Sequence, residues 1–227
     1  MLYYSETEIG QVQIVQICTN KWKENTFIVL EKNTGRCLII DPGYGYEEIS
    51  AELKKRKALV QGILATHTHF DHIASVHEVQ RDFGNPPFYF HAEDHKTLET
   101  ANVFTLFLNA GKISMPETSR HITQGEEIAL GSQNLQIIHT PGHTPGGCIF
   151  SLSHGSALFT GDILLKTPGD LHKLPGFDLK KLASSRKYVF EAFAESTPVF
   201  PGHGPVTTLR ELKQALVLGN ADGVSAT

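Results

Sequence analysis

The chain has 227 residues, of which 40% are hydrophobic and 19% are charged, and this globular composition excludes a mostly disordered chain, collagen and a coiled-coil rod. The length predicts a single domain over residues 1–227 rather than two small ones. Twenty basic residues against 24 acidic residues give a formal net charge of −4, which offers no bulk attraction to nucleic acid or to an anionic membrane surface.

Neither a membrane span nor a secretory signal is predicted. No apolar run approaches the roughly 18 residues that a membrane helix needs, and the first residues, MLYYSETEIG, lack the basic-then-apolar order of a signal peptide. Cys18, Cys37 and Cys148 are too few and too widely spaced for a disulfide framework or a thiolate metal site. We therefore expect a cytoplasmic protein with three buried thiols.

The N-terminal half begins with β-strands and continues with alternating helices and strands. Short apolar segments joined by turn residues predict strands over residues 12–18, 26–30 and 37–40. From residue 46 the apolar period changes to that of an amphipathic helix, and a strand follows over 59–65. A second helix is predicted over 73–83, a strand over 88–90, and a helix over 91–111.

The C-terminal half repeats this order. Strands are predicted over 127–130, 135–139, 148–152 and 157–160. Asp178 is placed to cap a helix with an apolar stripe, and a last strand near Val199 precedes a helix over about 208–218. We expect residues 220–227 to form a frayed tail. Strands and helices repeated twice without a linker predict an α/β fold, a four-layer αβ/βα sandwich.

Histidines are concentrated directly after the strand predicted over 59–65. There, His67, His69, Asp71 and His72 stand within six positions. In an extended segment His67 and His69 point the same way, so both rings can reach one metal ion, while the following turn aims Asp71 and His72 at a neighbouring point. A surface cluster of histidines is the alternative, but burying four polar side chains without partners would be costly, and this favours metal.

Three more segments place a potential metal ligand just beyond an apolar strand and beside glycine. They are TPGHTPGG with His143, FTGD with Asp162, and PGHG with His203. Each alone is typical of an ordinary turn. Together and in this order they strengthen the prediction of a metal site.

The series Asp41, His67-x-His69-x-Asp71-His72, His143, Asp162 and His203 resembles the five motifs of the metallo-β-lactamase superfamily. Within it, TPGHTPGG, FTGD and PGHG resemble the glyoxalase II-like, or hydroxyacylglutathione hydrolase-like, branch. The resemblance covers residues from about 12 to 210 and implies the αβ/βα sandwich with two divalent metal ions. Zinc is expected first, with iron or manganese as alternatives.

The resemblance also implies a role for each residue of the series. His67, His69 and His143 would hold one ion, Asp71, His72 and His203 the other, and Asp162 would bridge them. Asp41 would orient a ligand without binding metal. Two divalent cations outweigh the two carboxylates and one hydroxide, so the site favours a small anionic substrate, and coordination lowers the pKa of water from 15.7 toward 7.

These features favour a metal-dependent hydrolase acting on a thioester, such as an acylglutathione-like compound, because a thiolate leaves without a proton. A lactonase or other ester or amide hydrolase is an alternative, and its leaving group would need a proton, for which Asp71 is the nearest donor. An iron-dependent persulfide dioxygenase is another, with a mononuclear site of His67, His143 and Asp162.

The segment after Asp162 is the predicted place for a charged substrate tail. Lys166, His172 and Lys173 are candidates to receive its anionic end, with an ordinary surface loop as the alternative. Many members of the branch carry an arginine here, and this chain does not. Full-length glyoxalase II enzymes also bind glutathione through a C-terminal helical domain, whereas only 24 residues follow His203. The glutathione contacts, the acyl group and the oligomeric state therefore stay open.

Overall fold

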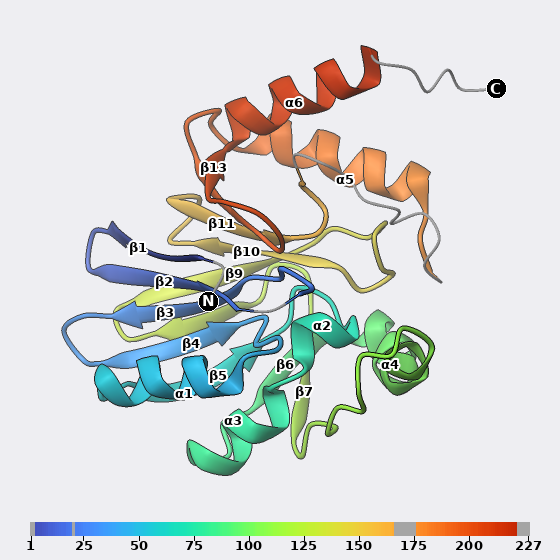
Figure 1. Ribbon diagram of the computed structural model, residues 1–227. Coiled ribbons are helices and arrows are strands. Elements are labelled where there is room, and N and C mark those ends of the chain that lie inside the picture. The colour runs from blue at the N-terminus through green and yellow to red at the C-terminus, as the bar shows by residue number, and fades with distance from the viewer. Residues whose placement is uncertain (1–2, 20, 166–175, 222–227) are drawn as a thin grey trace.

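Two β-sheets pack face to face, and helices cover both outer faces (Figure 1). The computed structural model describes residues 3–19, 21–165 and 176–221. The arrangement is the four-layer αβ/βα sandwich that the order of elements predicts. No helix of the described residues is long and apolar enough to cross a membrane.

The first sheet has seven strands that follow one another in chain order. They are β1 (Tyr3–Ile9), β2 (Val12–Cys18), β3 (Thr26–Glu31), β4 (Arg36–Ile40), β5 (Leu59–Leu64), β6 (Phe88–His91) and β7 (Ser119–Ile122). Strands β1 to β4 pair antiparallel, whereas β4 to β7 pair parallel. The parallel part needs helical crossovers, and these are α1 (Tyr46–Lys55), α2 (Phe70–Ile73), α3 (Val76–Asp82) and α4 (His95–Phe107).

The second sheet has six strands in the order β13-β12-β11-β10-β9-β8. They are β8 (Glu127–Leu130), β9 (Gln133–His139), β10 (Cys148–Leu152), β11 (Ala157–Gly161), β12 (Pro198–Pro201) and β13 (Thr207–Thr208). Only β11 and β12 pair parallel. Helices α5 (Leu179–Ala192) and α6 (Leu209–Ala221) cover its outer face (Figure 1).

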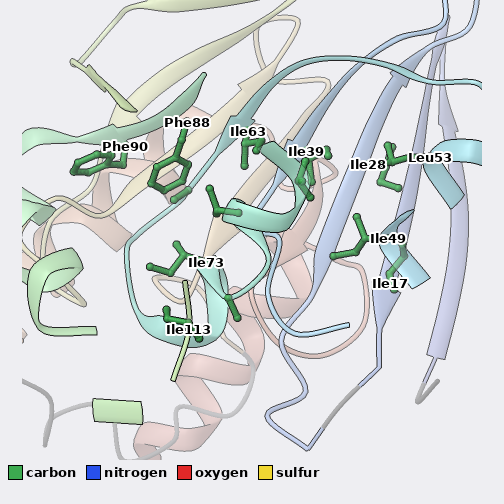
Figure 2. Close-up of a cluster of buried hydrophobic side chains, with 14 of the residues drawn as sticks. Ile17, Ile28, Ile39, Ile49, Leu53, Ile63, Ile73, Phe88, Phe90 and Ile113 are labelled. Carbon is green, nitrogen blue, oxygen red and sulfur yellow. The ribbon is translucent and has the colours of Figure 1, made fainter. Parts of the chain in front are cut away.

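Each boundary between layers is filled by its own hydrophobic cluster. Figure 2 shows the cluster beneath α1 to α4, where Ile28 and Ile39 of the first sheet pack with Ile49 of α1. A second cluster between the sheets includes Phe27 and Phe150, and a third joins the second sheet to α5 and α6. Successive side chains of a strand point to opposite faces, so β2 supplies Ile14 to one cluster and Val15 to another.

The structure contains three strands that the sequence analysis did not predict, namely β1 and β7 of the first sheet and the two-residue β13 at the edge of the second. Both β1 and β7 lie at edges of the first sheet, and their side chains are mostly partly or fully exposed. An edge strand has one unpaired side and buries little apolar surface, so its sequence lacks the apolar run that marks an inner strand.

Two helices differ from the prediction in the N-terminal half. The helix expected over 73–83 corresponds to α3, which starts only at Val76, whereas Ile73 is the last residue of the separate short helix α2. Between them, the backbone N–H of Ser75 donates to the carbonyl of Pro42. The helix expected over 91–111 begins with a 3-10 turn, Ala92–Asp94, and α4 ends at Phe107. Asn109 follows in the left-handed conformation, at φ 51°, which closes the helix earlier than Gly111.

The C-terminal prediction needs a smaller correction. Helix α6 continues to Ala221, so residues 220 and 221 are helical and are not part of a frayed tail. The remainder of the predicted tail, residues 222–227, lies outside the described residues. The cap of α5 is as expected: the carboxylate of Asp178 accepts a hydrogen bond of 3.0 Å from the backbone N–H of Lys181.

Candidate metal centre

Loops from both sheets bring seven potential metal ligands together. Those from the first sheet follow β5, where the extended backbone of His69 caps the short helix α2. Those from the second sheet lie in the β9–β10 loop and directly after β11 and β12. Because β11 and β12 run parallel, with Gly161 opposite Pro201, the loops that follow them emerge at the same edge of the sheet. The seven are His67, His69, Asp71, His72, His143, Asp162 and His203.

Three histidines form the first trio. Nε2 of His143 lies 3.2 Å from Nε2 of His67 and 3.0 Å from Nδ1 of His69. Their rings meet edge to face, with centroids 4.6 to 4.7 Å apart. Three ring nitrogens therefore converge on one point, as the sequence analysis expects for these residues.

Asp71, His72 and His203 form the second trio. Nε2 of His72 lies 3.3 Å from Nε2 of His203, and Oδ2 of Asp71 lies 3.8 and 3.7 Å from these two nitrogens. His72 is fully buried, whereas the side chain of His203 is 26% exposed. The second trio is thus the one closer to solvent.

Asp162 stands between the two trios. Its Oδ2 lies 3.6 Å from Nε2 of His143 in the first trio and 3.5 Å from Nε2 of His203 in the second. Its Oδ1 lies 3.7 Å from Nε2 of His72. The position predicted to bridge two ions is therefore within reach of both groups of nitrogens.

The donor set fits divalent metal ions. Two nitrogens bound to one tetrahedral zinc ion at about 2.0 to 2.1 Å lie about 3.3 Å apart, and the nitrogen pairs of the two trios lie 3.0 to 3.3 Å apart. Hydrogen bonds alone do not satisfy this arrangement, since Oδ1 of Asp162 is buried without a hydrogen-bond partner among the described residues. A cation would satisfy the facing lone pairs.

The electrostatics of the two trios differ. Burial, together with repulsion from the neighbouring histidines, lowers the pKa of His67. Burial is also the main cause that lowers the pKa of His69 to about 4 and the pKa of His143 to about 3. Burial opposes the charge of His72 as well, but three nearby aspartates, Asp71, Asp162 and Asp41, outweigh it and raise the pKa of His72 to about 10. The first trio consequently consists of neutral rings, and the second holds a proton.

Asp41 lies behind the ligands, where the sequence analysis places it. Its Oδ2 is 3.1 Å from Nδ1 of His72, so the Nε2 of that ring faces the site. The same carboxylate accepts hydrogen bonds from the backbone N–H of Thr66 at 2.7 Å and from its hydroxyl at 2.6 Å. Through Thr66, whose Oγ1 is 3.1 Å from Nδ1 of His67, Asp41 contacts a ring of each trio.

Asp94 is a buried residue that sequence reasoning missed. Its carboxylate accepts hydrogen bonds from the backbone N–H of Thr68 at 3.0 Å, the backbone N–H of Gly146 at 2.6 Å and the hydroxyl of Thr144 at 3.0 Å. It thereby connects the loop of His67 and His69 to the loop of His143. In the sequence it looks like an ordinary helix-start aspartate, and no motif marks it.

Gly202 allows the chain to pass close to the centre. A Cβ atom at this position would lie 2.2 Å from Oδ1 of Asp162 and 2.9 Å from Cε1 of His72. Any larger residue would therefore displace a potential ligand. This close approach explains the glycine before His203 in physical terms.

A cavity of about 550 Å³ opens onto the trios, and its wall includes His69, Asp71, His143, Asp162 and His203. The rest of its lining comes mainly from α4, the start of α2 and Trp22. Lys166, His172 and Lys173, the predicted receivers of a substrate tail, lie outside the described residues.

A second group of potential ligands, His91, Glu93 and His139, lies at the ends of β6 and β9. The two rings are stacked, with centroids 3.9 Å apart and planes within 12°. Parallel stacked rings cannot direct in-plane lone pairs at one ion, and Nε2 of His139 is 2.9 Å from the carbonyl oxygen of Pro145. This group is a structural contact between loops.

Comparison with known proteins agrees with the geometry. Residues 21–206 match the family model described as "Metallo-beta-lactamase superfamily". The chain belongs to the metallo-β-lactamase superfamily. Similar proteins include one of Aquifex aeolicus that is 35% identical over 82% of this chain and 86% of the relative. Hydroxyacylglutathione hydrolase GloC of Haemophilus influenzae is 26% identical over 88% of this chain and 91% of the relative.

Solved structures of the superfamily superpose closely on this chain. BLEG-1 B3 metallo-β-lactamase has a TM-score of 0.78 at 29% identity, covering 88% of this chain and 95% of the other. TTHA1623 in a di-iron-bound form has the same TM-score at 30% identity, covering 88% and 97%. The superfamily fold thus accounts for the sandwich.

Proposed function

We propose that this protein is a binuclear metal-dependent hydrolase of the glyoxalase II-like branch, which cleaves a small anionic thioester such as an acylglutathione-like compound. The observation that carries the proposal is the position of Asp162, whose carboxylate lies within 3.5 to 3.7 Å of nitrogens from both trios. A shared carboxylate is the feature that two ions about 3.5 to 4 Å apart require.

In this proposal the first trio would hold one ion, the second trio would hold the other, and Asp162 would be a ligand shared by both. When bound, the ions supply Lewis acidity and an activated water molecule at neutral pH. Zinc suits the imidazole-rich first trio. The di-iron form of TTHA1623 supports iron as the alternative.

The surroundings of the first trio and of Asp162 keep these ligands in the protonation state that metal binding requires. Histidine ligates through a neutral ring, and burial keeps the rings of the first trio neutral by lowering the pKa of each of them. Burial opposes ionisation of Asp162, but the surrounding histidines, His203 first, outweigh it and lower the pKa of this carboxyl group to about 2. Asp162 is therefore a carboxylate throughout the physiological range, and Asp41 fixes the direction of the His72 ring.

The thioester is favoured over other carbonyl substrates for two reasons. A thiolate departs without a proton, so no further acid is required. The similarity to GloC, whose name describes a hydroxyacylglutathione hydrolase, also supports this substrate class. The similarity to BLEG-1, described as a metallo-β-lactamase, favours as second candidate a lactone or amide substrate, for which Asp71 at the cavity would supply the proton.

The test combines metal content with substrate preference. Metal-loaded protein should contain two ions per chain and hydrolyse thioesters faster than lactones and β-lactams. Preference for a lactone or β-lactam would overturn the thioester assignment. A single tightly bound iron ion, together with oxygen consumption, would overturn the hydrolase assignment in favour of the persulfide dioxygenase.

Substitution of Asp162 tests the shared ligand directly. Residues that only orient a metal ligand contribute about 10- to 100-fold to metal affinity or activity, so Asp162→Ala should reduce both the affinity for ions and the rate by more than about 100-fold. A surface variant such as Asp82→Ala serves as the control. Two retained ions and near-normal activity in Asp162→Ala would show that this carboxylate is not shared.

A further inference from the structure

One face of α4 forms the outer wall of the cavity. The lining residues of this helix recur every three or four positions, which places them on a single face. That face changes character along the helix, from polar near its start to apolar near its end. The residues are Lys96, Thr97, Thr100, Val103, Phe104 and Leu108.

The apolar end of this wall faces aromatic side chains from other segments. Trp22 and Phe70 line the same cavity and pack edge to face with ring centroids 5.1 Å apart. On the α4 side Val103 is 63% exposed and Leu108 is 40% exposed, although both are aliphatic. Apolar surface that is left open to water beside a cavity is characteristic of ligand-binding sites.

This apolar region is continuous with the candidate metal centre. The cavity wall that carries Val103 and Leu108 also carries Asp162 and His203, so one substrate can contact both regions. Apart from the potential metal ligands, the ionisable side chains among the described lining residues are Lys96 and Glu93, both near the start of α4. A charged thiol half of a thioester would gain little binding free energy in the apolar region. An apolar acyl half would bind there favourably, because its surface would be removed from water.

We propose that the cavity beneath the C-terminal half of α4 binds the acyl chain of the substrate, and that this chain is an extended apolar acyl group rather than an acetyl or a small polar one. The inference rests on the proposed thioesterase function and specifies its substrate class. The cavity, at about 550 Å³, is within the range of 300 to 1,000 Å³ found for small-molecule sites.

Trp22 allows the proposal to be tested without turnover, because it is the single tryptophan of the chain and lines the cavity. Zinc-loaded protein is titrated with acetate, butanoate, hexanoate and octanoate while the fluorescence of Trp22 is recorded. A fully buried methylene strengthens binding by about fourfold, so octanoate should bind at least about tenfold more tightly than butanoate. Equal affinity for all four acids would overturn the proposal.

Two leucines at the C-terminal end of α4, one in its last turn and one directly after it, provide a matched pair of variants. Leu108 lines the cavity, whereas Leu106 is 84% exposed and does not. Leu108→Asn should weaken octanoate binding by about fivefold and leave acetate binding unchanged, and Leu106→Asn should change neither. Equal effects of the two substitutions would overturn the proposal, and thermal unfolding curves check that both variants are folded.

A second measurement separates this proposal from the thioesterase assignment. Hydrolysis is compared for acetyl, hexanoyl and octanoyl esters of one thiol. Chain-length-dependent binding of the acids without hydrolysis of any thioester would overturn the proposed reaction but keep the apolar site. Hydrolysis at rates independent of the acyl chain would keep the reaction and overturn the site.

Discussion

At the scale of single residues, Asp94 holds together the two loops that carry the first trio. All its carboxylate contacts are donors from those loops, namely two backbone N–H groups and one hydroxyl. An asparagine would keep the shape but present an NH₂ group to at least one donor. Leaving a buried polar group unpaired costs about 1 to 3 kcal/mol. The two loops would shift to avoid this cost, and the positions of His67, His69 and His143 would change with them.

We therefore expect Asp94→Asn to weaken ion binding at the first trio by about 10- to 100-fold while the second trio is less affected. Stepwise titration with a metal-binding dye would resolve the two affinities. Glu99→Gln, which changes an exposed carboxylate of the same helix, is the control. An equal loss at both trios would indicate general destabilisation instead of local positioning.

As the pH is lowered, the two trios should release their metal ions in a defined order. A metal ion must displace the proton of His72, whose pKa of about 10 results from the three aspartates around it, so its binding weakens about tenfold for each pH unit below that value. His69 and His143, with pKa values of about 4 and 3, take up protons only in stronger acid.

On lowering the pH from 8 to 5, the ion of the second trio should therefore be released first. Metal content after dialysis at successive pH values measures this order. The spectrum of a cobalt-substituted protein, or a comparison with Asp94→Asn, which is weakened at the first trio, identifies the ion that leaves first. Release of the first-trio ion before the second-trio ion would contradict the pKa values assigned to the two trios.

At the scale of elements, α5 depends on its cap. Asp178 satisfies one of the N–H groups that the first turn of a helix leaves open, by accepting from Lys181. Asp178→Ala should lower the free energy of unfolding by about 1 kcal/mol and leave the bound ions unchanged, because the backbone N–H of residue 178, which donates to the carbonyl of Gly142 beside His143, is kept in the variant. Chemical denaturation gives the first quantity and elemental analysis the second. Asp178→Asn should restore most of the loss.

Buried helices and strands were easier to predict from the sequence than exposed ones. Inner strands such as β4, with buried Cys37 to Ile40, carry continuous apolar runs and were predicted almost to the residue. Edge strands β1 and β7 have no such run and were missed. The ends of α4 depend on contacts made from elsewhere in the chain, since Asp94 turns inward to distant loops and Asn109 adopts a left-handed conformation. Local periodicity holds no information about such contacts.

The candidate site was more predictable than the helix ends. Its potential ligands all follow apolar strands, four of them clustered within residues 67–72 and the other three beside glycines, so their motifs are visible in a single sequence. Asp94 was not identified as part of a site, because its role depends on which loops it faces in three dimensions. Residues 166–173 were a candidate anion-binding segment, with an ordinary surface loop as the equal alternative; they lie outside the described residues, and the assignment stays a prediction.

At the scale of the whole molecule, the trios connect the two sheets. Each combines residues that follow β5 with residues from the second sheet. Bound ions should therefore stabilise the packing of one sheet on the other. At a free ion concentration 100 times the dissociation constant of each site the gain is about 2.7 kcal/mol per ion and about 5.4 kcal/mol for two, which for a chain of this size corresponds to roughly 10 to 20 °C in Tm.

Removal of the ions with a chelator should lower Tm by that amount, and addition of zinc should restore it. Differential scanning calorimetry measures both changes. Asp162→Ala should show a much smaller response to chelator. An identical Tm with and without ions in the unsubstituted protein would show that the sheets pack independently of the centre.

The distance along the chain between partners in each trio also bears on how fast the molecule folds and unfolds. His72 and His203 are 131 positions apart, and His67 and His143 are 76 apart. Closing such long loops is entropically costly, so these contacts belong to the late stages of assembly. Interactions formed after the transition state slow unfolding without accelerating folding. The ions should accordingly prolong the lifetime of the native state rather than hasten its formation.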